Sequence, residues 1–368
     1  MLDTEGYQQH EDLYYPDGNI ALVAQWEDPE SYVYHVVFRV HKSVLAKSSS
    51  VFEDMFSLPA SKSTEMYDGV PLVRMTDTGK EIEGLLQYLY SKPLLSLKPY
   101  DPNTPLRVRP LLRMADKFQI DALREHIVAQ LVSDWPGSLR QWDKLESEIQ
   151  AREKAAESDI FYDTDDPDID DQYPEPAAAI RLARDFDIPE ILSPAFYHLS
   201  RINIEHDWDA SRGLDRHGKP TRVASYHRRT ARWDLLEKED YVSVLRGRYR
   251  FKEAAVNTLS FSRVSSRSAA DKEEYPCLPK CNLEAFSGFW RDLHSDLKTT
   301  HDVLATLRVH VEDILSMYDG KICGFCYVHA SGHIRACRVK LWERLPEYFE
   351  LPAPEESASE EPSSEEES

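Results

Sequence analysis

The fold of the N-terminal third of the chain is decided by residues 38–56, which read FRVHKSVLAKSSSVFEDMF. Residues 32–40 are rich in β-branched and aromatic side chains, a composition that favours a strand. Beyond His41 and Lys42 the apolar residues follow the spacings of short amphipathic helices; they are Val44, Leu45, Val51, Phe52, Met55 and Phe56. His41 and Lys42 are therefore expected to form a structural junction between a strand and a helix.

This stretch resembles the signature of the BTB/POZ fold, in which a strand is followed by V-H-K/R-x-x-L-A and then by S-x-x-F-x-x-M-F. Three later segments are similar, in the same order, to the third strand of that family, to a helix ending in L-x-Y-L-Y and to a helix carrying L-L-x-x-A-D-K-F; they are residues 71–77, 82–90 and 111–118. Four ordered matches are far more specific than any one of them. We therefore identify residues 15–136 as a BTB/POZ domain, which implies an α+β fold with helices covering a small sheet.

Within this domain we expect a hairpin, with a first strand at residues 19–25 and a second at residues 32–40. Residues 1–14 are expected to form a flexible N-terminus. Three prolines in residues 94–109 indicate an irregular connection, and Pro110 then suits the first turn of the next helix.

The net charge of −21 is concentrated in two segments. Residues 153–175 hold ten acidic residues against Lys154, and residues 351–368 hold seven glutamates and no basic residue. Such compositions are typical of solvated linkers and tails. We therefore expect a charged helix and acidic linker at residues 137–176 and a disordered acidic tail at residues 351–368.

Between linker and tail, residues 177–350 are expected to form a mainly α-helical region. Its start, residues 180–189, repeats residues 112–121 at an offset of 68, with Arg, Ala, Phe and Ile in register. The repeat predicts a second helix–turn–helix unit whose second helix is residues 191–199; chance similarity between amphipathic helices is the alternative. Three segments are also similar to the helical region of many fungal BTB-domain proteins: residues 177–199, 231–236 and 341–349.

Two close cysteine pairs form the candidate metal site: Cys277 with Cys281, and Cys323 with Cys326. Four thiolates could hold a structural zinc, and no other cofactor is expected. The alternative is buried thiols without metal. We expect one long helix, residues 283–318, between the pairs.

Five cysteines in a chain without a signal peptide favour a reducing compartment, the cytoplasm or the nucleus.

A basic stretch is the candidate nucleic-acid interface, because its arginines are interleaved with aromatic residues. The candidate phosphate contacts are Arg222, Arg228, Arg229 and Arg232. The acidic residues 153–175 could instead neutralise these arginines within the chain. An isoelectric point of about 5.1 also argues against a dedicated nucleic-acid binder.

The nucleotide-binding and hydrolase motifs GxxxxGK[ST], GxGxxG, GxSxG and HExxH do not occur in the sequence, so we expect a non-enzymatic protein and name no catalytic residue. No apolar run approaches the ~20 residues of a membrane helix.

The BTB/POZ resemblance implies a protein-interaction scaffold that forms a homodimer and whose residues 177–350 bind a protein partner. The residues expected in the dimer interface or the domain core are Leu22, Val44, Leu45, Val51, Phe52, Met55 and Phe56.

Two alternative functions stay open. The chain could be a substrate adaptor of a cullin ubiquitin ligase, although Thr64-Glu65 does not match well the hydrophobic-x-Glu motif that such adaptors often carry. It could also be a transcription-type regulator that binds nucleic acid through the basic stretch and the zinc site.

Overall fold

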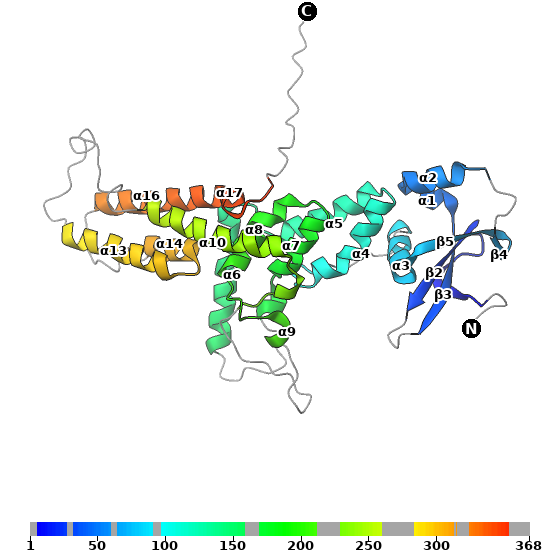
Figure 1. Cartoon of the computed structure of the whole chain (residues 1–368), viewed down its shortest axis with the longest axis horizontal. Coiled ribbons are helices and arrows are strands. Elements are labelled where there is room, and N and C mark those ends of the chain that lie inside the picture. Colours follow the sequence, from blue (N-terminus) through cyan, green and yellow to red (C-terminus); the bar gives the residue numbers. More distant parts are fainter. Residues whose placement is uncertain are drawn as a thin grey trace, which may run out of the picture. The chain divides into compact units, whose positions relative to one another are not determined.

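The structure is a computed structural model of the chain, and it describes residues 6–27, 32–59, 65–90, 97–158, 169–211, 229–259, 283–312, 314 and 324–352. The chain divides into two compact units, Met1–Asp134 and Trp135–Ser368 (Figure 1). The first is a sheet with helices and the second is mainly helical, so the predicted fold class is confirmed.

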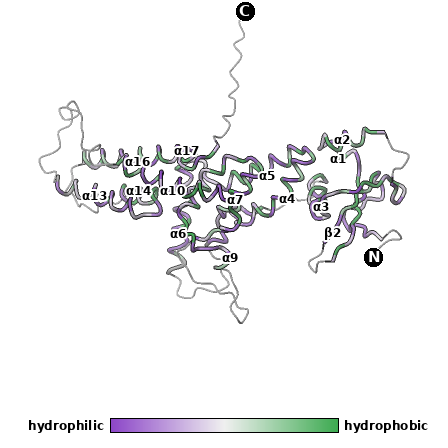
Figure 2. The backbone as a smooth tube through the Cα atoms, viewed as in Figure 1, coloured by the Kyte–Doolittle hydropathy of each residue, from purple (hydrophilic) through white to green (hydrophobic). Residues whose placement is uncertain are grey.

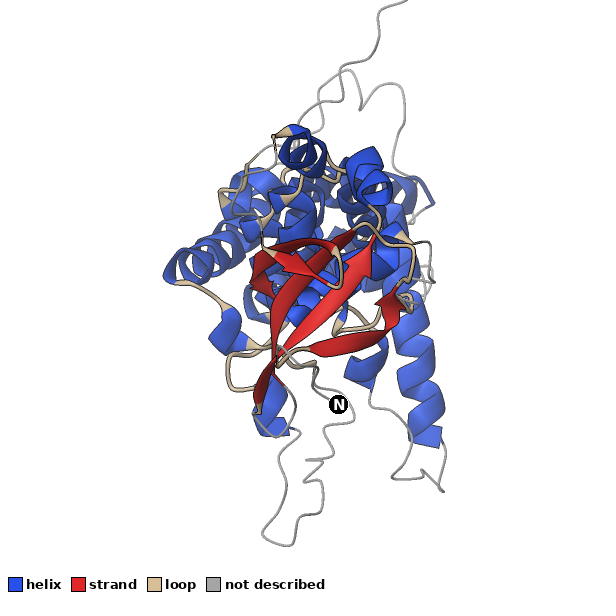
Figure 3. Cartoon of the chain, turned by 90° about the vertical axis from the view of Figure 1, so that its right-hand side faces the viewer, coloured by secondary structure: helices blue, strands red, loops and turns tan. Residues whose placement is uncertain are grey.

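The first unit is built on a five-stranded sheet with the order β1-β3-β2-β5-β4 (Figure 3). The strands are β1 (Gln8–Tyr14), β2 (Ile20–Glu27), β3 (Val33–Val40), β4 (Met66–Tyr67) and β5 (Val70–Thr78). Strands β2 and β3 are antiparallel, with Leu22 opposite Phe38, as the predicted hairpin requires. Both of these side chains are buried, because the central strands are covered on both faces.

The expectation of a flexible N-terminus is wrong for residues 8–14, which form β1 and pair in parallel with β3. Only Leu13 of this strand is fully buried, so its sequence lacks the apolar alternation that identifies most strands. Polar and aromatic contacts hold the strand instead. The ring of His10 stacks on Phe38 with 4.9 Å between centroids, and its Nε2 lies 3.3 Å from Oε1 of Glu83.

The described residues of the first unit also form five helices: α1 (Lys42–Ser48), α2 (Ser50–Ser57), α3 (Gly79–Leu89), α4 (Thr104–Lys117) and α5 (Asp121–Asp134). Ser49 caps α2, since its Oγ accepts a hydrogen bond from the amide of Phe52 at 3.1 Å. The same hydroxyl donates to the carbonyl of Phe118 at 2.5 Å. The rings of Phe52 and Phe118 stack with centroids 4.5 Å apart, so one polar and one aromatic contact join α2 to the end of α4.

The predicted position of Pro110 is wrong. Helix α4 begins at Thr104, with Pro105 in its first turn, and Pro110 lies in the helix interior. A proline there removes one hydrogen bond to the carbonyl four residues earlier. That carbonyl belongs to Leu106, which lies on the exposed side of the helix, where water can replace the missing donor.

In the described part of the second unit the helices are α6 (Leu139–Ser158), α7 (Pro176–Asp185), α8 (Leu192–Arg201), α9 (Trp208–Ser211), α10 (Lys238–Thr258), α13 (Leu283–Thr299), α14 (Val303–Glu312), α16 (Gly324–Glu343) and α17 (Leu345–Phe349). Three 3-10 turns lie between them: η1 (Ile169–Gln172), η2 (Pro189–Ile191) and η3 (Trp233–Leu235). Hydrophobic and hydrophilic stretches alternate along these helices, as expected when each buries one face (Figure 2). The core is aromatic, with Trp142, Tyr197 and Phe349 almost fully buried.

The predicted repeat between residues 112–121 and 180–189 is present in the backbone. In both places the helix ends in a residue with positive φ, and the next amide donates to the carbonyl five residues before it. Together these two features define the Schellman motif. The residues are Gln119 (φ 50°), Ile120 and Ala115 in the first unit, and Asp187 (φ 52°), Ile188 and Ala183 in the second, with a bond of 2.9 Å in each.

The single helix predicted for residues 283–318 is wrong, because α13 and α14 are separated at residues 300–302. Asp302 caps α14, and its Oδ1 accepts from the amide of Ala305 at 3.0 Å. Its own amide donates to the hydroxyl of Thr300 at 3.0 Å. Capping by these short polar side chains ends one helix and starts the next.

Asp134 gives the first unit a dependence on pH. Its side chain is 5% exposed, and Oδ1 accepts from the amide of Tyr100 at 3.1 Å. Burial raises its pKa from 3.8 to about 6. The folded state binds this proton more tightly than the unfolded state, so protonated Asp134 stabilises the fold. Its contribution to the free energy of unfolding is present below about pH 4 and is lost as the pH rises through about 6.

We predict that Asp134→Asn raises the free energy of opening of α5 at pH 7 by about 1 to 3 kcal/mol. It also removes the fall in that free energy between pH 4 and pH 6. Hydrogen exchange with mass spectrometry on α5 peptides measures both effects, and Asp54→Asn on the exposed side of α2 is the control. An unchanged pH profile in the Asp134 variant would contradict the assignment.

Candidate functional site

An apolar surface covers part of α1 and α2. Val44, Val51, Met55 and Phe56 are partly buried, and Leu58, which follows α2, is 70% exposed. We call these five residues the α1–α2 patch. The other residues predicted for the interface or core, Leu22, Leu45 and Phe52, are each at most 1% exposed and belong to the core of the unit.

The junction between β3 and α1 is held by hydrogen bonds of His41 and Lys42. The amide of His41 donates to Oη of Tyr90 at 2.8 Å, and its Nδ1 lies 2.9 Å from the same oxygen. The amide of Lys42 donates to Oδ1 of Asn19 at 2.8 Å. The ammonium of Lys42 lies 5.5 Å from the ring centroid of Phe56, at the edge of the α1–α2 patch. Both side chains therefore make structural contacts at this junction.

Most of the candidate zinc site lies outside the described residues, namely Cys277, Cys281 and Cys323. Cys326 is buried on α16, as is Cys337 three turns further along, and neither of these two cysteines forms a disulfide. Burial raises the pKa of Cys337 to about 12, so this thiol is protonated and unreactive at neutral pH. In the part of the chain that the structure describes, no three His, Cys, Asp or Glu side chains are arranged to hold a metal.

The basic stretch is described from Arg229 onward, while Arg222 and Arg228 fall outside the described residues. Nε of Arg229 donates to Oδ1 of Asp170 at 2.7 Å. The other oxygen of Asp170 accepts from the amide and the hydroxyl of Thr230 at 2.8 and 2.5 Å. An aspartate from the end of the acidic segment thus holds the first described residues of the basic stretch.

Arg232 is paired in the same way. Its guanidinium lies 3.8 Å from Glu175 and 4.2 Å from the ring centroid of Trp208, and the side chain is 9% exposed. Glu175 also accepts from the amides of Arg232 and of Ala177 and Ala178 at the start of α7. Arg229 and Arg232 are thus engaged by acidic residues of the same chain, which is the alternative that the sequence left open.

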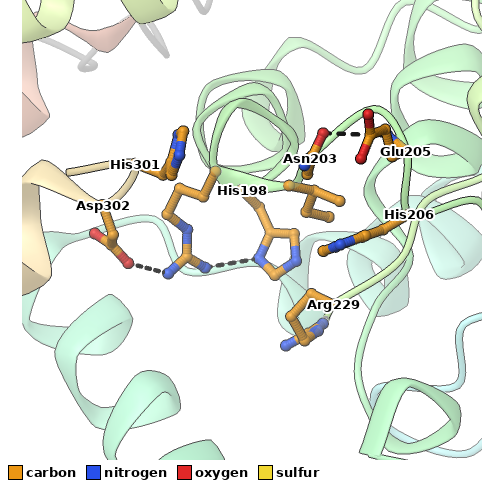
Figure 4. A pocket seen from close by; sticks show the side chains of 9 residues that line it. His198, Asn203, Glu205, His206, Arg229, His301 and Asp302 are labelled. Carbon is orange, nitrogen blue, oxygen red and sulfur yellow. Dashed lines mark hydrogen bonds and ion pairs between the residues drawn. The ribbon is translucent and has the colours of Figure 1, made fainter. Parts of the chain in front are cut away.

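A polar recess of about 530 Å³ lies in the second unit (Figure 4). It is formed by the end of α8, the segment that follows it, the start of the 229–232 segment and the turn before α14. Its lining residues are His198, Arg201, Ile202, Asn203, Glu205, His206, Arg229, His301 and Asp302.

The back of the recess is Arg201, whose terminal nitrogens donate to both oxygens of Glu146 at 2.7 and 2.9 Å and also to Asp302. Its guanidinium lies 4.6 Å from the ring centroid of Trp142. Burial alone would lower the pKa of Arg201, but Asp302 and Glu146 raise it well above its ordinary value. The arginine is therefore charged and joins α6, α8 and the turn before α14.

His198 stands beside Arg201 and is 4% exposed. Its Nδ1 lies 3.0 Å from Nη2 of Arg201, and since a guanidinium can only donate, Nδ1 accepts. Burial and the charges of Arg229 and Arg201 lower the pKa of His198 well below its ordinary value, so the ring is neutral and its one proton is on Nε2. This buried Nε2 makes no hydrogen bond within the described structure.

The recess was not predicted from the sequence, although the sequence of α8 contains one indication of it. His198 and Arg201 are three residues apart on α8, and both are turned inward with Phe196, Tyr197 and Leu199. A polar pair on the buried face of a helix indicates a partnered site. The partners themselves, Glu146 and Asp302, are too distant in the sequence to be identified by spacing.

Comparison with known families gives one match. The model of the BTB/POZ domain matches residues 28–134, which confirms the resemblance drawn from residues 38–56 and ends where the first unit ends. No curated protein matches the chain significantly. Among the described helices, none is both long enough and apolar enough to cross a membrane.

We predict that Arg201→Met lowers the free energy of unfolding of the second unit by about 3 to 5 kcal/mol, because it leaves two carboxylates without their counter-charge. The matched control is Arg344→Met, whose pair with Glu347 is more than half exposed on both sides. Its cost should stay below about 1 kcal/mol. Urea unfolding of the full chain compares the two variants, and equal losses would refute the role of Arg201.

The zinc site stays a prediction. If the four cysteines hold a metal, analysis of the purified chain finds one equivalent of zinc and replacement of Cys281 by serine removes it; buried thiols without metal are the alternative. Zinc-free protein that retains its helical content before any chelation would contradict the site.

Proposed function

Residues 28–134 are a BTB/POZ domain, a protein-interaction domain, and from this premise we propose that the chain is a non-enzymatic scaffold. The scaffold self-associates through its BTB/POZ domain and recruits a protein partner through its second unit. The two cysteines in the described part of the chain form no disulfide, which agrees with a reducing compartment, the cytoplasm or the nucleus.

The observation that carries self-association is the α1–α2 patch. Four of its apolar side chains occupy two helices that pack against each other, and the fifth and most exposed, Leu58, follows α2 and is 70% exposed. Burying such a side chain in an interface contributes about 1.5 to 3 kcal/mol. A second copy of the chain offers the same patch, so a two-fold interface is self-complementary.

Recruitment by the second unit is supported by apolar exposure on α10. Leu245 and Tyr249 are 65% and 67% exposed and lie four residues apart, on one face of the helix. Neighbouring exposed aromatic and aliphatic side chains are typical of protein-binding surfaces. The polar recess beside His198 adds a second feature that a partner could occupy.

A cullin adaptor is the second candidate from the sequence, and one contact bears on it. Both carboxylate oxygens of Glu65 accept from Arg74, at 3.0 and 2.5 Å, so the acidic residue nearest to an adaptor motif is engaged within the domain. We therefore prefer the scaffold. Co-purification with a cullin N-terminal domain would support the adaptor instead.

We predict that Leu58→Glu weakens self-association about 30-fold, because it removes an apolar contact and places a charge in the interface. The matched control is Leu245→Glu, which changes an equally exposed leucine of the second unit. Sedimentation equilibrium on the full-length variants gives the two dissociation constants. The interface would be misplaced if both variants behaved alike, and self-association itself would fail if the unmodified chain stayed monomeric at micromolar concentration.

A further inference from the structure

The recess around His198 presents hydrogen-bond donors that nothing in the described chain accepts from. The first is the Nε2–H of His198, which is buried and without a partner. The second is the pair of terminal nitrogens of Arg229, since the hydrogen bond of this residue to Asp170 uses Nε. Figure 4 shows the ring of His206 pointing toward the ring of His198, with the side chain of Arg229 beside them. A buried donor without an acceptor is unfavourable, because it loses its hydrogen bond to water and gains none, so this arrangement favours a ligand that accepts.

The charges that act on the ring of His198 are positive, although acidic residues outnumber arginines in the wider surroundings. The two charged groups that act on the ring of His198 are both arginines, Arg201 and Arg229, and the field that disfavours a protonated imidazole favours a negative ligand at the same place. A metal ion does not fit, because Nε2 carries the proton and has no free lone pair.

The wider charge count limits that anion to a single charge. Three carboxylates already face the two arginines: Glu146 and Asp302 bind Arg201, and Asp170 binds Arg229. One more negative charge can be held by the free donors, whereas a phosphate dianion would add a second charge against this excess of acids. A carboxylate is therefore the best match.

The recess is also large enough and open enough for part of a polypeptide. Its volume of about 530 Å³ lies in the ordinary range of ligand sites. Asn203, Glu205 and His301 at its rim are exposed, so a ligand can enter from solvent.

We propose that this recess binds a carboxylate of a protein partner, held by the Nε2–H of His198 and the terminal nitrogens of Arg229, with His206 beside them. This inference rests on the proposed recruitment of a partner by the second unit, and it names the chemical group that the partner supplies. Arg201 is a positioning residue, because its bond to Nδ1 keeps the proton of His198 on Nε2.

The test follows the imidazole Nε2 resonance of His198 in the full-length protein labelled with 15N-histidine. The probes are N-acetyl-glutamate N-methylamide, N-acetylglycine, N-acetyl-glutamine N-methylamide and inorganic phosphate. The glutamate probe offers a side-chain carboxylate and the glycine probe a C-terminal one, so their relative affinities identify the source. We expect a saturable shift with either or both carboxylates and at least tenfold weaker binding of the amide and of phosphate.

Arg229→Gln should weaken carboxylate binding at least tenfold, while Arg344→Gln, which removes an exposed arginine elsewhere in the unit, should not change it. His206→Ala provides a second variant with a half-buried side chain, and we expect it to weaken binding as well. Equal binding of glutamine and glutamate probes, tighter binding of phosphate, or no saturable shift with any probe would each overturn the proposal.

Light scattering on the same samples keeps this result separate from the proposed self-association. A dimer that gives no probe response contradicts the recess alone. A monomer with a normal probe response contradicts the α1–α2 patch alone.

Discussion

A buried guanidinium is the constraint on which the second unit depends. Arg201 is taken out of water at the end of α8, which costs several kcal/mol unless counter-charges and hydrogen bonds replace the solvent. Glu146 on α6 and Asp302 before α14 supply them, and Tyr197 donates to Asp302 at 2.8 Å. Three segments far apart in the sequence must therefore meet at one point, and the recess beside His198 is a consequence of that meeting.

The two units use different means for similar tasks. In the first, hydrogen bonds fix the turn from strand to helix, with Oη of Tyr90 in contact with both the amide and the ring of His41. In the second, acidic residues at the end of the charged linker hold a basic segment, as Asp170 does with Arg229. The first unit leaves the apolar α1–α2 patch exposed. The second unit leaves hydrogen-bond donors in the recess without acceptors in the described chain. These two surfaces support binding to another copy and to a partner, respectively.

The sequence predicted those parts of the structure whose conformation is set by residues close together in the chain. The repeat at an offset of 68 correctly indicated two similar helix ends, because the turn at Gln119 and Asp187 is formed within a few residues. Strand β1 was missed because its place depends on His10 stacking against a distant phenylalanine rather than on apolar alternation. The break before α14 was overlooked although Asp302 is a capping residue. The recess could not be predicted, since it joins residues more than a hundred positions apart.

The proposal of a self-associating BTB/POZ scaffold is tested most directly by the mass of the full chain in solution. Light scattering coupled to size exclusion, over a range of micromolar concentrations, should give twice the chain mass of 42.5 kDa. A mass of 42.5 kDa at every concentration would contradict it.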